Sequence, residues 1–431
     1  MSRKLLLVGF AITLSPAVIA QTMDSATREL IEKLQARIDG LERRVVELEK
    51  ENGAPARAST PSAPAASPTQ VVHQAHEQAP VSAEAQPSYP LLKIAGFGDL
   101  NFSATDLHAP ASGFQQQTYL TPHSGFEEGQ FTLQFSSALS PKVSVFSEIT
   151  LTARPDAGTG SPAAPGFNAE LERLIIRYDL NDRFKLSFGR YHTPINYWNT
   201  AFHHGSWLQT TISRPEMAQF GGSFIPVHFV GALAEGVLPA GGLNLNYNLG
   251  IGNGRGQILS RAGDFGDVNN NRAWLANVFI KPDHLYGLQA GGSVYHDMLN
   301  PLAGSPAHEW IQAAHLVWNR ESPEFIAEFA NVTHQPVFGG VVSHSQASYA
   351  QTAYRLPWLD KKWKPYYRFE YIHVPQSDAL FRNLVPTFHS STAGIRYDIS
   401  NFAAFKVEYR NYVRRGLPSI YGFFAQTSFT F

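Results

Sequence analysis

The chain has 431 residues, a mass of 47.6 kDa, a formal net charge of −1 and no cysteine. The near-zero charge argues against nucleic-acid binding, and the lack of cysteine excludes disulfides, thiolate zinc sites and cysteine nucleophiles. Charged residues make up 16% of the chain, against roughly 25% in soluble domains, while aromatics reach 12% at a mean hydropathy of −0.19. This composition excludes a multi-span helical membrane protein and favours a β-barrel with alternating lipid-facing and water-facing residues.

Residues 1–20 have the features of a secretory signal peptide. A basic pair near the start precedes a short apolar stretch over residues 5–14, and small residues around Ala20 fit a cleavage that leaves Gln21 first. The apolar stretch is too short to cross a bilayer. We therefore predict export, and, with the barrel described below, a place in the outer membrane of a Gram-negative bacterium.

Residues 21–52 are predicted to form a periplasmic coiled coil. Apolar residues recur at alternating spacings of three and four, with β-branched residues at the a positions and leucine at d. The predicted core consists of Ile31, Leu34, Ile38, Leu41, Val45 and Leu48. This core by itself favours two strands, but the Arg and Glu pairs in 37–42 and 44–49 resemble a trimer-favouring signature, so we expect a homotrimer. A dimer and a lone amphipathic helix on a surface are the alternatives.

Residues 53–90 are predicted to be a disordered linker. They are rich in Ala, Pro, Ser and Gln and nearly free of aromatic residues, so they bury too little apolar surface to fold. At about 3.1 Å per residue, such a linker reaches on the order of 100 Å. That length would hold the coiled coil well away from the rest of the chain.

Residues 91–431 are predicted to form an all-β transmembrane barrel of antiparallel strands. Apolar and polar residues alternate over 243–252 and 405–410, and runs of about ten to twelve residues suit the tilted strands of a membrane barrel. The final aromatic strand, ending at Phe431, resembles the signal through which the barrel-assembly machinery recognises such proteins. We count sixteen candidate strands, with fourteen to eighteen left open, and a barrel of this size has a water-filled lumen.

The candidate strands begin near Leu91, Phe126, Lys142, Phe167, Arg183, Pro226, Gly241, Asn270, Leu285, His308, Ser322, Ser345, Lys362, His389, Phe402 and Ser419. Aromatic residues near the strand ends are Trp274, Trp310, Trp318, Tyr191, Tyr371, Tyr397 and Tyr421. We expect them to form girdles at the two lipid–water interfaces.

A long loop over about residues 192–218 is predicted to fold into the lumen and narrow it, since it is too long for a turn and too aromatic for a solvated loop. The candidate constriction and solute-binding residues are Arg190, His192, Trp198, His203, His204, Arg214, Arg368, Arg396 and Arg410. Further basic residues lie nearby at Arg173, Arg177, Arg183, Lys185 and Lys406. Lumen charge sets solute preference, so these residues favour small anions. The alternative is that they pair with neighbouring carboxylates and only solvate the inner wall.

We expect no metal and no cofactor. His203 and His204 are adjacent and point oppositely on an extended chain, and no carboxylate lies three or four residues from them or from His192. A metal site needs three or four converging ligands. Polar contacts within the constriction are the expected role of these histidines.

The body resembles the phosphate-selective porin O/P superfamily, in particular its trimeric members with an N-terminal periplasmic coiled coil, one of which admits dicarboxylates. The residues that carry this resemblance are 189–215, 287–295, Glu328–Ala330, Arg368–Tyr371 and Phe431. The resemblance implies a sixteen-stranded trimeric channel whose third extracellular loop forms the eyelet. It does not extend to a ladder of phosphate-binding lysines and arginines, because no dense run of loop lysines is present.

The sequence therefore predicts a non-enzymatic porin, in contact with outer-membrane lipid, for passive diffusion of small hydrophilic, anionic solutes. One alternative is a structural tether whose coiled coil contacts peptidoglycan while the barrel serves as an anchor. Another is a barrel hydrolase that uses a histidine with Ser206 or Thr210.

Overall fold

The computed structural model describes residues 89–106, 124–154, 158, 160–202, 205–219 and 224–431. The predicted signal peptide, the coiled coil with its core from Ile31 to Leu48, and nearly all of the linker lie outside the described residues. No helix within the described ranges is long and apolar enough to cross a membrane.

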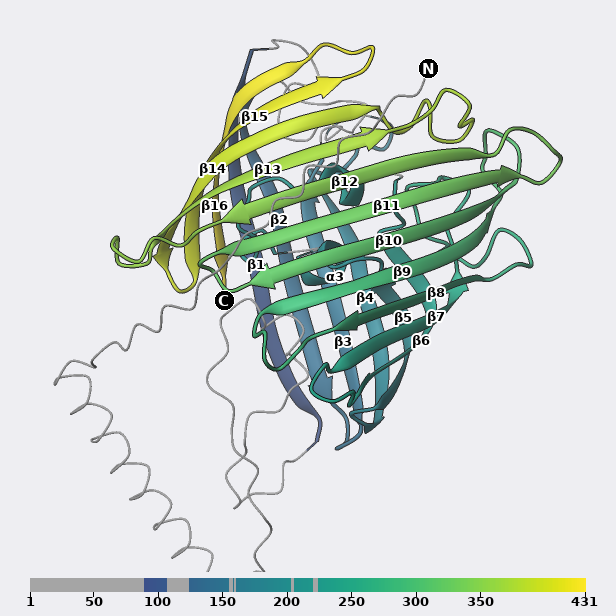
Figure 1. Cartoon of the computed structure of the whole chain (residues 1–431), viewed down its shortest axis with the longest axis horizontal. Coiled ribbons are helices and arrows are strands. Elements are labelled where there is room, and N and C mark those ends of the chain that lie inside the picture. Colours follow the sequence, from purple (N-terminus) through teal and green to yellow (C-terminus); the bar gives the residue numbers. More distant parts are fainter. Residues whose placement is uncertain (1–88, 107–123, 155–157, 159, 203–204, 220–223) are drawn as a thin grey trace, which may run out of the picture. The chain divides into compact units, whose positions relative to one another are not determined.

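Sixteen antiparallel strands form a closed barrel, in which each strand pairs with its neighbours in sequence and β1 pairs with β16 (Figure 1). The strands are β1 (Leu91–Thr105), β2 (Gly125–Ala138), β3 (Val143–Ala153), β4 (Phe167–Asn181), β5 (Phe184–His192), β6 (His228–Leu238), β7 (Leu245–Asn253), β8 (Ala273–Ile280), β9 (Leu288–Leu299), β10 (Ala307–Asn319), β11 (Glu324–Pro336), β12 (Ser343–Ala353), β13 (Trp363–His373), β14 (Phe388–Ser400), β15 (Ala403–Arg414) and β16 (Ile420–Thr430). The prediction of a sixteen-stranded barrel is confirmed. The largest error in a strand start is at β7, expected near Gly241 and observed at Leu245.

The outer face of the barrel wall is apolar and its inner face is polar. On β13, Phe369 is 44% exposed whereas the preceding Arg368 is 0% exposed. Outward apolar residues include Leu249, Ile251, Tyr367, Phe405, Tyr409 and Phe423, and inward polar residues include Thr132, Gln134, Glu370, Lys406, Glu408 and Gln426. A half-exposed sheet of a soluble protein buries its apolar face instead. This inverted arrangement is the one that a barrel surrounded by lipid requires.

Aromatic residues of the expected girdles face outward at strand ends, including Trp274, Tyr371 and Tyr421. Tyr191 is the exception, because it is buried at 5% exposure near the end of β5, opposite Phe229. The alternation along β5 puts Tyr191 on the inner face, so its expected place in a girdle is wrong.

The two ends of the barrel differ in their connections. At one end the chain turns within residues 139–142, 182–183 and 401–402, and the barrel's first and last strands also begin and end there. At the other end, β5 connects to β6 through residues 193–227, which carry the short helices α3 (Trp198–Ala201) and η2 (Glu216–Ala218). The described residues 193–202 and 205–219 are almost all buried. We call them the inner segment, because their partners lie on strands across the barrel.

Candidate functional site

The first part of the inner segment is held by strands on the far side of the barrel. The backbone N–H groups of Tyr197 and Trp198 donate to the Glu328 carboxylate of β11, at 2.8 and 2.6 Å. Helix N-termini have donors without intrahelical partners, and this carboxylate satisfies two of them at the start of α3. The Trp198 ring is fully buried and packs against Phe202 and Tyr349, with centroids 4.9 and 6.0 Å apart.

Carboxylates of the wall also accept the backbone donors of the second part of the inner segment. Glu408 on β15 accepts the N–H groups of Ile212 and Ser213, at 2.9 and 3.2 Å. Glu370 on β13 accepts the N–H of Glu216 at 2.6 Å. These carboxylates are at most 2% exposed, so each buried charge is compensated by hydrogen bonds rather than by water.

Basic side chains of the same wall bind the carbonyls of the inner segment. Arg368 donates to the carbonyls of Ser213 and Arg214, at 2.8 and 3.0 Å, and its Nε contacts Glu370 at 2.9 Å. The guanidinium also contacts the hydroxyls of Thr211 and Ser213. Every donor direction of this fully buried side chain is therefore occupied, as burial of an arginine requires.

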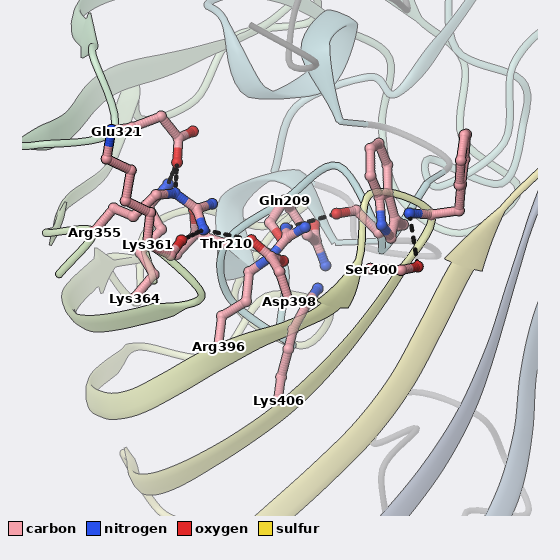
Figure 2. Close-up of polar contacts among 12 residues, drawn as sticks. Gln209, Thr210, Glu321, Arg355, Lys361, Lys364, Arg396, Asp398, Ser400 and Lys406 are labelled. Carbon is pink, nitrogen blue, oxygen red and sulfur yellow. Dashed lines mark hydrogen bonds and ion pairs between the residues drawn. The ribbon is translucent and has the colours of Figure 1, made fainter. Parts of the chain in front are cut away.

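Arg396 and Lys406 make the same kind of contact nearer the short-turn end. Arg396 donates to the carbonyls of Trp207 and Gln209, at 2.6 and 3.0 Å, and Lys406 donates to those of Ser206 and Thr211. Figure 2 shows both side chains pointing from their strands toward the inner segment. An ion-pair chain continues beside them through Asp398, Arg355, Glu321 and Lys364.

The structure places Arg368, Arg396 and Arg410 on the inner wall, and their expected role in a constriction or in solute binding stays a prediction. Arg410 pairs with Glu408 on its own strand. Their polar groups contact the inner segment and neighbouring carboxylates. Asp99 on β1 also accepts a hydrogen bond from Ser206 at 2.9 Å. The strands β11 to β15 and β1, with β16 between β15 and β1, form what we call the packed half of the barrel.

Arg214 belongs to the inner segment itself. Its Nε and Nη2 donate to the carbonyl of Ala218, at 3.0 and 2.7 Å. Burial lowers the pKa of Arg214 to about 9, an effect that the negative charge of Glu172 partly offsets. The side chain therefore remains charged at neutral pH.

Arg190 and His192 lie at the start of the connection into the inner segment. The β4–β5 pairing ends at Leu174 and Arg190, and Arg190 then donates to the carbonyls of Leu171 and Glu172 beyond it. It also contacts Glu170 and Asp264, at 3.0 and 2.9 Å. His192 is buried, while the predicted site residues His203 and His204 lie outside the described residues.

A cavity of about 610 Å³ lies on the opposite side of the inner segment from the packed half. Strands β3 to β10 contribute to its wall, and we call them the open half. Asp182 and Asp283 line the cavity, so it reaches the short turns. Asparagines 246, 248 and 277 face it from β7 and β8.

The charges around the cavity are mixed, because four basic side chains line it together with the carboxylates of Asp182, Glu235 and Asp283. Arg173 pairs with Glu148, and Arg177 pairs with Asp179 at 2.7 Å. Lys185 and Lys281 also line the cavity, and neither has an ion pair with another residue in the described ranges. The alternation in 243–252 could have revealed Asn246 and Asn248 from the sequence, but nothing in the sequence distinguished Lys281 from a solvated turn residue.

No family model matches the chain, and no curated protein matches it. Several solved structures do. The anion-selective porin of Comamonas acidovorans is 11% identical with a TM-score of 0.55, over 79% of this chain and 100% of that one. The outer membrane channel DcaP of Acinetobacter baumannii is 12% identical with a TM-score of 0.52, over 81% and 100%.

The trimer form of OmpT, an outer membrane protein of Vibrio cholerae, is 10% identical with a TM-score of 0.50, over 80% of this chain and 100% of that one. At such identities, these likenesses show a common fold and nothing finer. The chain has the closed barrel fold of these outer-membrane proteins.

Proposed function

We propose that this chain is an outer-membrane porin through which small hydrophilic solutes diffuse passively, with a preference for anions. The observation that carries the proposal is the inverted wall, apolar outside and polar inside, around an interior that retains a cavity of about 610 Å³. Lipid stabilises such an outer face, and water and polar solutes occupy such an interior. No catalytic residue is needed for this function.

The solute path in this proposal follows the open half. The inner segment fills the packed half and leaves the cavity between itself and strands β3 to β10. Four basic side chains, Arg173, Arg177, Lys185 and Lys281, line this path against three carboxylates, and asparagines supply neutral donors and acceptors. The carboxylates are Asp182, Glu235 and Asp283, so the lining keeps a small positive excess. Positive charge in a narrow, partly desolvated passage attracts anions and repels cations.

The relatives by fold support the same function. One is described as an anion-selective porin, another as an outer membrane channel, and a third was obtained as a trimer. Together with the resemblance of residues 189–215 to the phosphate-selective porin O/P superfamily, they support a homotrimer of barrels. Residues 1–20 would be the signal peptide, residues 21–52 the periplasmic coiled coil and residues 53–90 its linker.

Planar-bilayer recording of the purified protein tests the proposal. We expect discrete single-channel steps and, in a KCl gradient, a reversal potential whose sign shows chloride to be more permeant than potassium. Protein unfolded by heat before addition serves as the control. Absence of steps from correctly folded protein would refute the channel, whereas steps with a cation-selective reversal potential would refute only the anion preference.

A further inference from the structure

Three potential metal ligands converge at the two ends of the connection that carries the inner segment. His192 ends β5, and its cross-strand partner His228 begins β6. Glu172 reaches them from β4. One nitrogen of each histidine and one carboxylate oxygen of Glu172 all lie within 4.8 Å of one another. All three residues are buried, at no more than 9% exposure.

A β-bulge explains how the carboxylate reaches the histidines. In the β3–β4 pairing, Arg173 lies opposite Glu148 and Leu171 opposite Ile149, so Glu172 is the extra residue between them. Bulges of this kind re-aim a side chain away from the regular alternation. The Glu172 Oε2 atom lies 2.7 Å from His228 Nε2, and the two imidazole rings are 5.7 Å apart.

We propose that Glu172, His192 and His228 bind a divalent transition metal, with Zn²⁺ as the best match. Two histidines and one carboxylate, with a fourth position open, form a known zinc ligand set. Ligand atoms around tetrahedral zinc lie about 3.4 Å apart, as bond lengths of about 2.0–2.1 Å dictate. To bind zinc, the 2.7 Å distance between His228 and Glu172 must lengthen by about 0.7 Å. Any two ligand atoms as far apart as the 4.8 Å limit must approach by about 1.4 Å. Side-chain rotation supplies both changes.

The surroundings give this site an access route and also limit its affinity. His192 lines the cavity, so a hydrated ion can reach the ligands from the lumen. Two cations lie close to Glu172: Arg190 Nη1 at 3.6 Å, and Arg214, whose pKa responds to the Glu172 charge. Their positive charge repels the metal ion and lowers the affinity of the site. We therefore expect EDTA to remove the bound zinc readily.

Bound zinc would join β4, β5 and β6 at the point where the chain leaves the wall and returns to it. Both ends of residues 193–227 would then be fixed to each other by one ion. Zinc binding does not depend on solute passage, so the inference stands independently of the proposed function.

Equilibrium dialysis of the full-length, tag-free protein in detergent tests the site. After treatment with EDTA, the protein is dialysed against ZnCl₂ and its bound zinc is measured by mass spectrometry. We expect one zinc per chain, and less than about a tenth of that in His192→Ala/His228→Ala at the same free zinc. Glu172→Gln should weaken binding by at least about tenfold, the cost of losing even a residue that only supports a ligand.

The matched control is a second pair of neighbouring histidines, His296 and His308, whose rings are 5.5 Å apart. They do not belong to a three-ligand group within the described residues. His296→Ala/His308→Ala should therefore keep the zinc. Equal zinc in both double variants, or none in the wild type, would overturn the proposal.

A measurement on the wild type covers the case in which the alanine variants fail to fold. Co²⁺ in a tetrahedral His/carboxylate site absorbs visible light strongly, whereas six-coordinate Co²⁺ absorbs weakly. Addition of one equivalent of Co²⁺ should give the tetrahedral spectrum, and Zn²⁺ should abolish it. A six-coordinate spectrum would rule out the site.

Discussion

The packed half and the open half of this barrel present the same kinds of side chain to the interior, yet they use them differently. In the packed half, the charges of Arg368, Glu370, Lys406 and Glu408 are fully or almost fully buried and bind the backbone of the inner segment. In the open half, Lys185 and Lys281 line a cavity. A buried charge with several partners fixes a segment in place, whereas a charge that faces water is free to attract or repel solutes in the cavity.

The largest expected effect comes from removing a charge in the packed half. Arg368→Met removes the basic partner of the Glu370 carboxylate and the donor to two carbonyls of the inner segment, and breaking a buried pair costs about 3–5 kcal/mol. We expect a matching loss of unfolding free energy in lipid vesicles, together with larger and noisier single-channel currents from a loosened inner segment.

Arg177→Met is the matched control in the open half. Its partners Asp179 and Glu235 keep 33% and 30% of their side chains exposed, so water can compensate them. We expect a loss of about 1 kcal/mol and steady currents. Equal losses in the two variants would show that the halves do not differ as described.

The next effect concerns selectivity. Lys185→Glu/Lys281→Glu reverses two cavity charges that lack an ion pair within the described residues. In a KCl gradient, the reversal potential should therefore move toward the equilibrium potential of potassium. Lys142→Glu, an exposed substitution in the turn between β2 and β3, changes net charge without facing the cavity. If Lys142→Glu moves the reversal potential as far per reversed charge as the double variant does, the solute path does not follow the open half.

The smallest expected effect lies at the short-turn edge of the packed half. Burial alone would raise the pKa of Glu321, but Lys364 and Arg355 lower it to about 2, from an ordinary value of 4.5. The stabilisation from this carboxylate is therefore complete above pH 4.5 and is lost as the pH falls toward 2.

Glu321→Gln should lower the unfolding free energy by about 1–3 kcal/mol at pH 7. Urea unfolding in vesicles at several pH values measures this difference. The curves of variant and wild type should converge below pH 4.5. A difference that persists unchanged near pH 2 would contradict the role assigned to the two basic partners.

The barrel could be predicted from the sequence because alternation is a local signal. Each strand start was found within a few residues, since the polar–apolar period changes where a strand begins. The place of Arg368 and Arg396 on the inner wall follows from the same period. Their partners do not, because the carbonyls that they bind lie more than 150 residues away in sequence.

The grouping of Glu172 with His192 and His228 also could not be predicted. It depends on a bulge in β4 and on the cross-strand pairing of β5 with β6, neither of which leaves a motif in the sequence. Ligand spacings of three or four residues along the chain do not reveal such a group. The predicted coiled coil, which rests on heptad spacing alone, stays a prediction.

The seam between β1 and β16 has a consequence for how the molecule is made. Gly96 and Phe431 exchange two backbone hydrogen bonds, at 3.0 and 3.1 Å, which extend the β1–β16 pairing that closes the ring. Until β16 is in place, β1 presents an unpaired edge, which is a template for pairing with other chains. The unclosed barrel therefore has to be shielded from other copies of the chain until β16 has docked against β1.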